Sequence, residues 1–187
     1  NQWELVPEPR VSDHVMLRLS SATSLPLEEA REILDQANLI YQNLNDKAGI
    51  ADVKVLNGEI QIELGNLSAA QAYYNDARFL YLDAGQHLDQ AKAGEVLVKI
   101  NLSRGLNVRA SEMIDFTEEA FRQANSEINW VRLKIIRGDL ERIQGQIAES
   151  RAYYFEAAED LRDKENSSEF FALIKLAEVN FLLNNMT

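Results

Sequence analysis

Apolar positions recur along this chain with a period of 40 residues and, inside each period, with the spacing of an α-helix. One set of them occupies offsets 0, 3, 4, 7 and 11, which lie on one face of a helix. We name the helix that carries this set helix B. Its rows are Ala30, Ala70, Ala110 and Ser150; Ile33, Tyr73, Met113 and Tyr153; Leu34, Tyr74, Ile114 and Tyr154; Ala37, Ala77, Thr117 and Ala157; and Tyr41, Tyr81, Phe121 and Leu161.

A second apolar stripe precedes each helix B and defines a helix A. Its rows are Val53, Ala93, Leu133 and Leu173; Leu56, Val96, Ile136 and Leu176; and Ile60, Ile100 and Leu140, a row that Asn180 breaks. The connections also recur every 40 residues, with Gly65, Gly105 and Gly145 between A and B, and Asn45, Gly85 and Asn125 between B and the next A. Gly and Asn tolerate the left-handed conformation that ends a helix, so we expect helix ends at these residues. Ser126 and Ser167 are candidate N-caps.

The two stripes predict eight helices. The B helices are expected at 27–44, 68–84, 108–124 and 148–163, and the A helices at 47–64, 87–104, 127–144 and 168–184. Residues 1–26 are expected to form an extended arm and a degenerate first helix over 12–22, and residues 27–187 the repeats. One helix pair cannot bury both of its faces, so neighbouring pairs should stack into a solenoid.

The segment from Leu64 to Ala77 resembles the second half of a tetratricopeptide repeat, with the turn glycine Gly65 followed by Leu67, Ala70 and Tyr74. Gly145, Ile147, Tyr154 and Ala157 repeat these marks, and the resemblance covers about residues 25–184. It implies an all-α, right-handed superhelical solenoid of antiparallel helix pairs whose A helices line the concave face. A generic helical bundle is the alternative, but a bundle has no reason to keep a 40-residue register.

This chain departs from the tetratricopeptide consensus in three ways. Its period is longer than the ~34 residues of the consensus, its tryptophan position holds Val, Ala or Leu, and no repeat has the closing proline. It is in this respect similar to the long tetratricopeptide variants of kinesin light chains and of bacterial regulators with a maltose-activator-like helical sensor domain.

Charge is distributed unevenly between the two kinds of helix. The predicted A helices hold as many basic as acidic residues, whereas the B helices carry a clear acidic excess, and the whole chain has a net charge of -11. A charge-balanced inner face suits a polypeptide or a small polar ligand better than a polyanion. The acidic chain argues against nucleic acid and against anionic membrane as partners, because both require a basic surface.

The partner-binding surface is expected on the side of the A helices opposite the apolar stripe. The residues predicted there are Lys54, Gln61, Val98, Asn101, Leu102, Lys134, Glu141 and Arg142. Gln61, Asn101 and Glu141 share one repeat position, so we expect a polar row able to hydrogen-bond an extended peptide. The alternative for each residue is an ordinary solvated helix face. The clamp of chaperone-binding tetratricopeptide domains needs an Asn one turn after a Lys, but Gly58 follows Lys54 at that place.

The sequence shows no combination of residues typical of a catalytic or metal site. There are no cysteines and two histidines, His14 and His87, and no phosphate loop, nucleophile elbow or zinc-binding His pair is present. We therefore expect no enzyme, no cofactor and no metal. Carboxylate pairs such as Glu118–Glu119 lie on acidic B helices and are interpreted as solvated faces. No apolar run reaches the roughly 20 residues of a membrane span.

Two functional hypotheses follow. The first is a protein-interaction scaffold that binds a peptide or a partner helix in the concave groove, and the alternative is a ligand-sensing regulatory domain of a larger signalling or transcription protein. The apolar last helix at 168–184 lacks a B partner, which predicts either a homodimer through Phe181 and Leu182 or a segment of a longer solenoid; the second is favoured. We expect a soluble protein, located in the cytoplasm or the periplasm.

Overall fold

The computed structural model describes residues 27–161 and 172–180, and this part of the chain consists of helices joined by short turns. The helices are α2 (Leu27–Leu44), α3 (Lys47–Glu63), α4 (Leu67–Asp83), α5 (His87–Ser103), α6 (Asn107–Gln123), α7 (Glu127–Ile143) and α8 (Ile147–Leu161). Residues 172–180 are also helical. The bounds of α2 to α8 agree with the predicted ones to within one or two residues. The predicted arm and first helix at 1–26, and the ends of the last helix, lie outside the described residues.

Each of the turns that join α2 to α8 in sequence is built on one residue in the left-handed conformation. The six residues are Asn45, Gly65, Gly85, Gly105, Asn125 and Gly145, with φ between 51° and 82°. After α3, the Asn66 N–H donates to the Gln61 carbonyl at 2.8 Å and the Gly65 N–H to the Ile62 carbonyl at 2.9 Å. These two bonds satisfy carbonyls that a helix end leaves without partners. The predicted role of these six positions as helix ends is therefore confirmed.

The helix starts are capped in different ways. The Asp46 carboxylate accepts a bond from the Gly49 N–H at 3.0 Å, and the Asn66 side chain accepts one from the Ala69 N–H at 3.3 Å. Ser126 occupies the N-cap position of α7, as predicted, but makes no capping bond; its hydroxyl instead accepts from the Asn129 side-chain amide at 2.8 Å. Ser167 lies outside the described residues.

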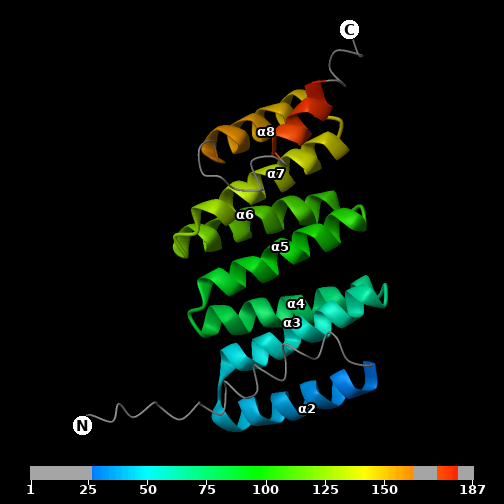
Figure 1. Ribbon diagram of the computed structural model, residues 1–187, viewed down its shortest axis with the longest axis vertical. Coiled ribbons are helices and arrows are strands. Elements are labelled where there is room, and N and C mark those ends of the chain that lie inside the picture. The colour runs from blue at the N-terminus through cyan, green and yellow to red at the C-terminus, as the bar shows by residue number, and fades with distance from the viewer. Residues whose placement is uncertain (1–26, 162–171, 181–187) are drawn as a thin grey trace, which may run out of the picture. The chain divides into compact units, whose positions relative to one another are not determined.

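The helices form antiparallel A–B pairs in two compact units, Asn1–Gln86 and His87–Thr187. In the first unit α3 packs most extensively against α4, and α2 contacts α3. In the second unit the closest pairs are α5 with α6 and α7 with α8, and α6 contacts α7 (Figure 1). The A helices are α3, α5, α7 and the segment 172–180, and the B helices are α2, α4, α6 and α8. This order confirms an all-α fold of sequential helix pairs.

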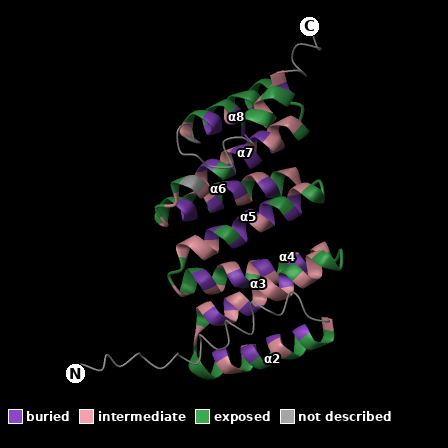
Figure 2. Ribbon diagram, viewed as in Figure 1, coloured by how far each residue is buried: buried purple, intermediate pink, exposed green. Residues whose placement is uncertain are grey.

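The predicted stripe of helix B forms the core of both units. The rows of Ala30, Leu34 and Ala37 are buried in each repeat from α2 to α8, and the row of Tyr41 is buried from α2 to α6, whereas the row of Ile33 is half-buried. Figure 2 shows the buried residues recurring along each helix. Tyr41, Ile114, Phe121 and Tyr154 are at most 1% exposed. Ser150 takes the place that alanine occupies in the other repeats and is fully buried. The alternation of small and large side chains lets the paired helices approach closely while the rings fill the space between them.

Candidate functional site: the exposed face of the A helices

The A helices of the second unit are buried over more than one side. On α5, Ala91 and Val98 join a core with residues of α6 and α7, including Ile114 and Leu133. A second side of α5 is also buried, at Ala93, Leu97 and Ile100. The helix therefore exposes only a narrow strip, unlike a surface helix with one apolar stripe.

The prediction that Val98 and Asn101 are exposed is wrong. Val98 is fully buried and Asn101 is 2% exposed. The reason is that α5 is buried on the side opposite the predicted stripe as well, because Ala91 and Val98 pack on the paired helix B instead of facing solvent. Val98 occupies the repeat position of Gly58 and Gly138, which lie directly under tyrosine rings of helix B.

Lys54 and Lys134 face the B helices and not the free side of the A helices. The Lys54 ammonium is 3.2 Å from an Asp76 carboxylate oxygen of α4. That of Lys134 lies 2.7 Å from Asp160 of α8 and 4.3 Å from the centre of the Trp130 ring. Both lysines therefore connect A helices to the B helices that follow them.

The remaining four predicted residues are half-buried. They are Gln61, Leu102, Glu141 and Arg142. Leu102 packs against the core of the second unit, and the guanidinium of Arg142 lies 3.7 Å from the Asp139 carboxylate. Gln61 belongs to the first unit and Glu141 to the second. A role of these residues in partner binding stays a prediction.

The exposed strip of the second unit uses the same repeat positions on α5 and on α7. On α5 it contains the exposed residues Lys92, Lys99 and Ser103, and on α7 the residues 40 later, which are the exposed Arg132 and Ile143 and the half-buried Asp139. The spacing of 7 and 11 residues puts each trio on one face of its helix. We call these six residues the A face. The sequence contained a signal that could have located the A face. Ala51, Ala91 and Val131 form a further apolar row on the A helices, and all three are fully buried, so the exposed strip lies between this row and the predicted stripe.

Glu95 connects the two helices of the A face. Its side chain is 7% exposed, and its Oε1 atom receives both the Lys99 ammonium at 2.6 Å and the Arg132 guanidinium at 3.1 Å. Arg132 also donates to the Asn129 side-chain oxygen at 3.3 Å. Lys99 and Arg132 remain 53% and 44% exposed. A buried carboxylate thus holds two exposed cations side by side.

Asp139 forms a second polar junction, near the end of α7. Its Oδ1 atom accepts the Tyr154 hydroxyl at 2.8 Å and lies 3.4 Å from the ammonium of Lys175 in the helix at 172–180. Burial, with a smaller contribution from the bond to Asp139, raises the pKa of Tyr154 to about 12. The junction joins α7, α8 and the segment 172–180.

A hollow of about 300 Å³ lies on the other side of α7, between α6 and α8. Lys134 and Arg137 lie in it beside the rings of Trp130 and Tyr153. Arg137 is paired with Asp115 and lies 3.8 Å from Glu118, and Lys134 is paired with Glu156 and Asp160. Carboxylates of the flanking B helices therefore already neutralise these cations.

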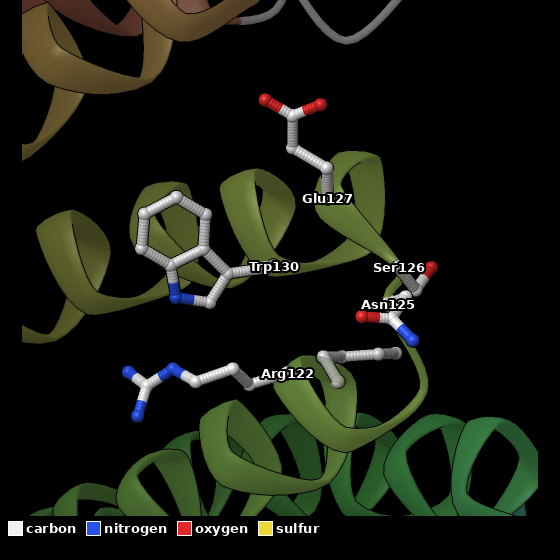
Figure 3. A pocket seen from close by; sticks show the side chains of 6 residues that line it. Arg122, Asn125, Ser126, Glu127 and Trp130 are labelled. Carbon is white, nitrogen blue, oxygen red and sulfur yellow. The ribbon is translucent and has the colours of Figure 1, made fainter.

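A separate hollow of about 320 Å³ lies at the turn between α6 and α7. It is lined by Phe121, Arg122, Asn125, Ser126, Glu127 and Trp130. Figure 3 shows the Trp130 ring and the Arg122 side chain extending from α7 and α6 on the same side of this turn. Arg122 is paired with Glu118 and Glu119 of its own helix.

The helix at 172–180 differs from the earlier A helices in its exposure. Leu173 is 44% exposed, whereas Val53, Ala93 and Leu133 at the same repeat position are at most 3% exposed. Ile174 is also exposed. Phe181 and Leu182, on which the predicted homodimer depends, lie outside the described residues, so that prediction stays open.

The described residues contain no group of acidic and histidine side chains arranged to hold a metal ion. None of the described helices is long and apolar enough to cross a membrane.

Comparison with known proteins identifies the fold. No protein-family model matches the chain, and no curated protein matches it in sequence. Among solved structures the chain is similar to BtubC (BKLC) from P. vanneervenii, with a TM-score of 0.76 and 14% sequence identity over 89% of this chain and 70% of that chain. The fold is a tetratricopeptide-like helical repeat.

Proposed function

We propose that the chain is a protein-interaction module that binds an extended polypeptide along the A face of its second unit. The observation that carries the proposal is the repetition of one strip on neighbouring A helices, where the exposed Lys92, Lys99 and Ser103 are followed 40 residues later by the exposed Arg132 and Ile143 and the half-buried Asp139. The strip offers donors, acceptors and one large apolar side chain at regular spacing. An extended polypeptide has the groups that match them, because its backbone carries N–H donors and carbonyl acceptors and its side chains alternate along it.

Two further observations favour a polypeptide over a polyanion. The chain has a net charge of -11, which repels nucleic acid and anionic lipid. The cations of Lys54, Lys134 and Arg137 are paired with B-helix carboxylates and do not form a basic surface. A phosphate-rich ligand would therefore meet few available cations on the described residues.

A blocking experiment tests the proposal. A random peptide library is selected on the whole chain, and the affinity of enriched peptides is measured by isothermal titration calorimetry. Ser103→Trp with Ile143→Trp fills the A face, and Gln123→Trp with Ala152→Trp adds the same bulk at exposed B-helix positions. We expect the first variant to lose about tenfold or more in affinity and the second to bind as the wild type. Peptides that bind both variants equally well would place the interaction elsewhere.

A ligand-sensing function is the second candidate, and the hollow at Trp130 favours it. Its volume of about 320 Å³ falls at the small end of typical ligand sites, and it combines two aromatic residues with polar side chains. Trp130 itself reports binding, because Trp3→Phe leaves it as the one tryptophan in the chain. Titration of this variant with a fragment library should give a saturable change in emission that Arg122→Met weakens. Emission that stays constant across the library would rule out this candidate.

A further inference from the structure

The two cations that Glu95 holds are not neutralised by it. Lys99 and Arg132 both contact the same oxygen, Oε1, so one carboxylate serves two positive groups and the cluster carries a net charge of about +1. Among the described residues neither cation has a second carboxylate within 4 Å. An ammonium has three donors and a guanidinium five, and most of these remain available.

This surplus distinguishes the cluster from the other lysines and arginines of α5, α7 and the helix at 172–180. Lys92 is paired one to one with Asp89, at 2.9 Å. Lys134 and Arg137 each have two carboxylates, and Lys175 lies near both Asp139 and Glu178. Lys99 and Arg132 are also about half exposed. They form the point of the A face where an incoming anion gains attraction without displacing a carboxylate of this chain.

We propose that Lys99 and Arg132 together bind the side-chain carboxylate of an Asp or Glu residue in the partner polypeptide. The inference rests on the proposed function and specifies one contact of its partner, a single acidic side chain. Glu95 keeps the two cations close, because it is almost fully buried and bonds one cation from each helix. A carboxylate has two oxygens, so it can accept from both cations at once. Hydrogen bonds between ionised partners are also stronger than those between neutral ones.

The test compares peptides and variants in one cycle. Peptides that bind the A face are synthesised with each Asp or Glu in turn replaced by Asn or Gln, and with a free or an amidated C-terminus. The variant is Lys99→Met, Arg132→Met and Glu95→Gln together, so that no buried carboxylate is left without a partner. Lys47→Met with Asp83→Asn, an exposed one-to-one ion pair of the first unit outside the A face, is the matched control. Thermal unfolding followed by circular dichroism verifies that both variants are folded.

We expect one acidic residue of the peptide to lose about tenfold or more in affinity when it becomes an amide, and the triple variant to lose a similar factor. The two changes together should cost no more than either alone, the control should stay within about twofold, and amidating the C-terminus should have little effect. Affinity should also fall as salt is raised.

Three outcomes would overturn the inference. If A-face peptides tolerate every acid-to-amide change, or bind the triple variant unchanged, the polypeptide site stands but its acidic specificity fails. If only the amidated C-terminus weakens binding, the cations recognise a chain end and not a side chain. If no peptide is sensitive to Ser103→Trp with Ile143→Trp, the proposed function fails and this inference fails with it.

Discussion

The ring of Tyr74 lies where a side chain on residue 58 would begin. A Cβ atom placed on Gly58 would be 2.7 Å from Cε2 of Tyr74, closer than real Cβ contacts. The same relationship recurs between Gly138 and Tyr154, at 2.5 Å, and the intervening repeat has Val98 and Ile114 at these two positions. A tyrosine on helix B therefore coincides with a glycine on helix A, and a smaller side chain on B with a larger one on A.

Alanine at Gly58 or Gly138 should destabilise the protein, although alanine is the better helix former by about 1 kcal/mol. Overpacking against a buried ring costs roughly 1–3 kcal/mol and outweighs this gain. Gly138→Ala should cost more, because the bond between Tyr154 and Asp139 restrains the ring. Urea unfolding measures both. In a Tyr74→Ile background, which imitates the middle repeat, Gly58→Ala should become neutral or stabilising; an equal cost in both backgrounds would contradict the explanation.

Alanine at Gly145 should also be destabilising, but for a different reason. Its φ is +82°, and an added Cβ meets nothing within 4 Å, so the cost of roughly 1 kcal/mol comes from the backbone conformation alone. Asn125, with φ +51°, provides the control: Asn125→Gly should be tolerated and Asn125→Ala should not. Thermal unfolding of the three variants checks the order. No loss of stability in Gly145→Ala would show that the turn can change its conformation.

The unfolding free energy should fall as the pH rises from about 10 to about 12. Tyr154 keeps its proton until about pH 12 in the folded chain, whereas a tyrosine in the unfolded chain titrates near pH 10. Between these values the unfolded state binds fewer protons, so stability is fully present below pH 10 and is lost as the pH approaches 12.

Tyr154→Phe isolates this contribution, because it removes the titrating group and the bond to Asp139. The variant should be less stable at pH 8 by about 1–2 kcal/mol, since a buried hydrogen bond to a charged group is lost. Its stability should depend less steeply on pH between 10 and 12. Parallel pH curves for the two proteins, measured by urea unfolding, would exclude Tyr154 as a source of the dependence.

Lys134→Met should cost more stability than Lys54→Met. The Lys134 side chain is 17% exposed, contacts two carboxylates and lies over Trp130, whereas Lys54 is 31% exposed and contacts one carboxylate and the ring of Tyr73 at 5.5 Å. We expect about 1–2 kcal/mol for Lys134 and under about 1 kcal/mol for Lys54. Urea midpoints of the two variants measure the difference, and equal midpoints would mean that the second carboxylate and the indole contribute little.

The fold could be predicted from the sequence because its strongest signals are local and repeat. Asn45 and Gly65 mark the ends of helices through their backbone conformation, and the rows of Tyr74 and Ala77 place one face of each helix B in the core. These properties depend on neighbouring residues and on the period of 40. Bounds correct to one or two residues follow from them.

The site could not be predicted in the same way, because exposure on an A helix depends on what packs against both of its sides. Treating the row of Ala93 as the whole apolar face left Val98 and Asn101 on the outside, although both are buried. Counting charges over whole helices likewise assigned the charge of Lys134 to the inner face, although its carboxylate partners are on α8. The paired cations Lys99 and Arg132 were missed because their common partner, Glu95, is 37 residues from Arg132 in sequence.

The pairing of Gly138 with Tyr154 and of Val98 with Ile114 has a consequence for how such an array can be recombined. Moving α5 into the place of α7 would bring a valine against a tyrosine ring, and the reverse exchange would leave a void beside an isoleucine. The hairpin of an A helix and its following B helix is therefore the smallest segment that can be duplicated, deleted or grafted without a compensating change. Chimeras of this chain should have their junctions in the turns at Gly85 and Asn125, between one hairpin and the next, and not in those at Gly105 and Gly145.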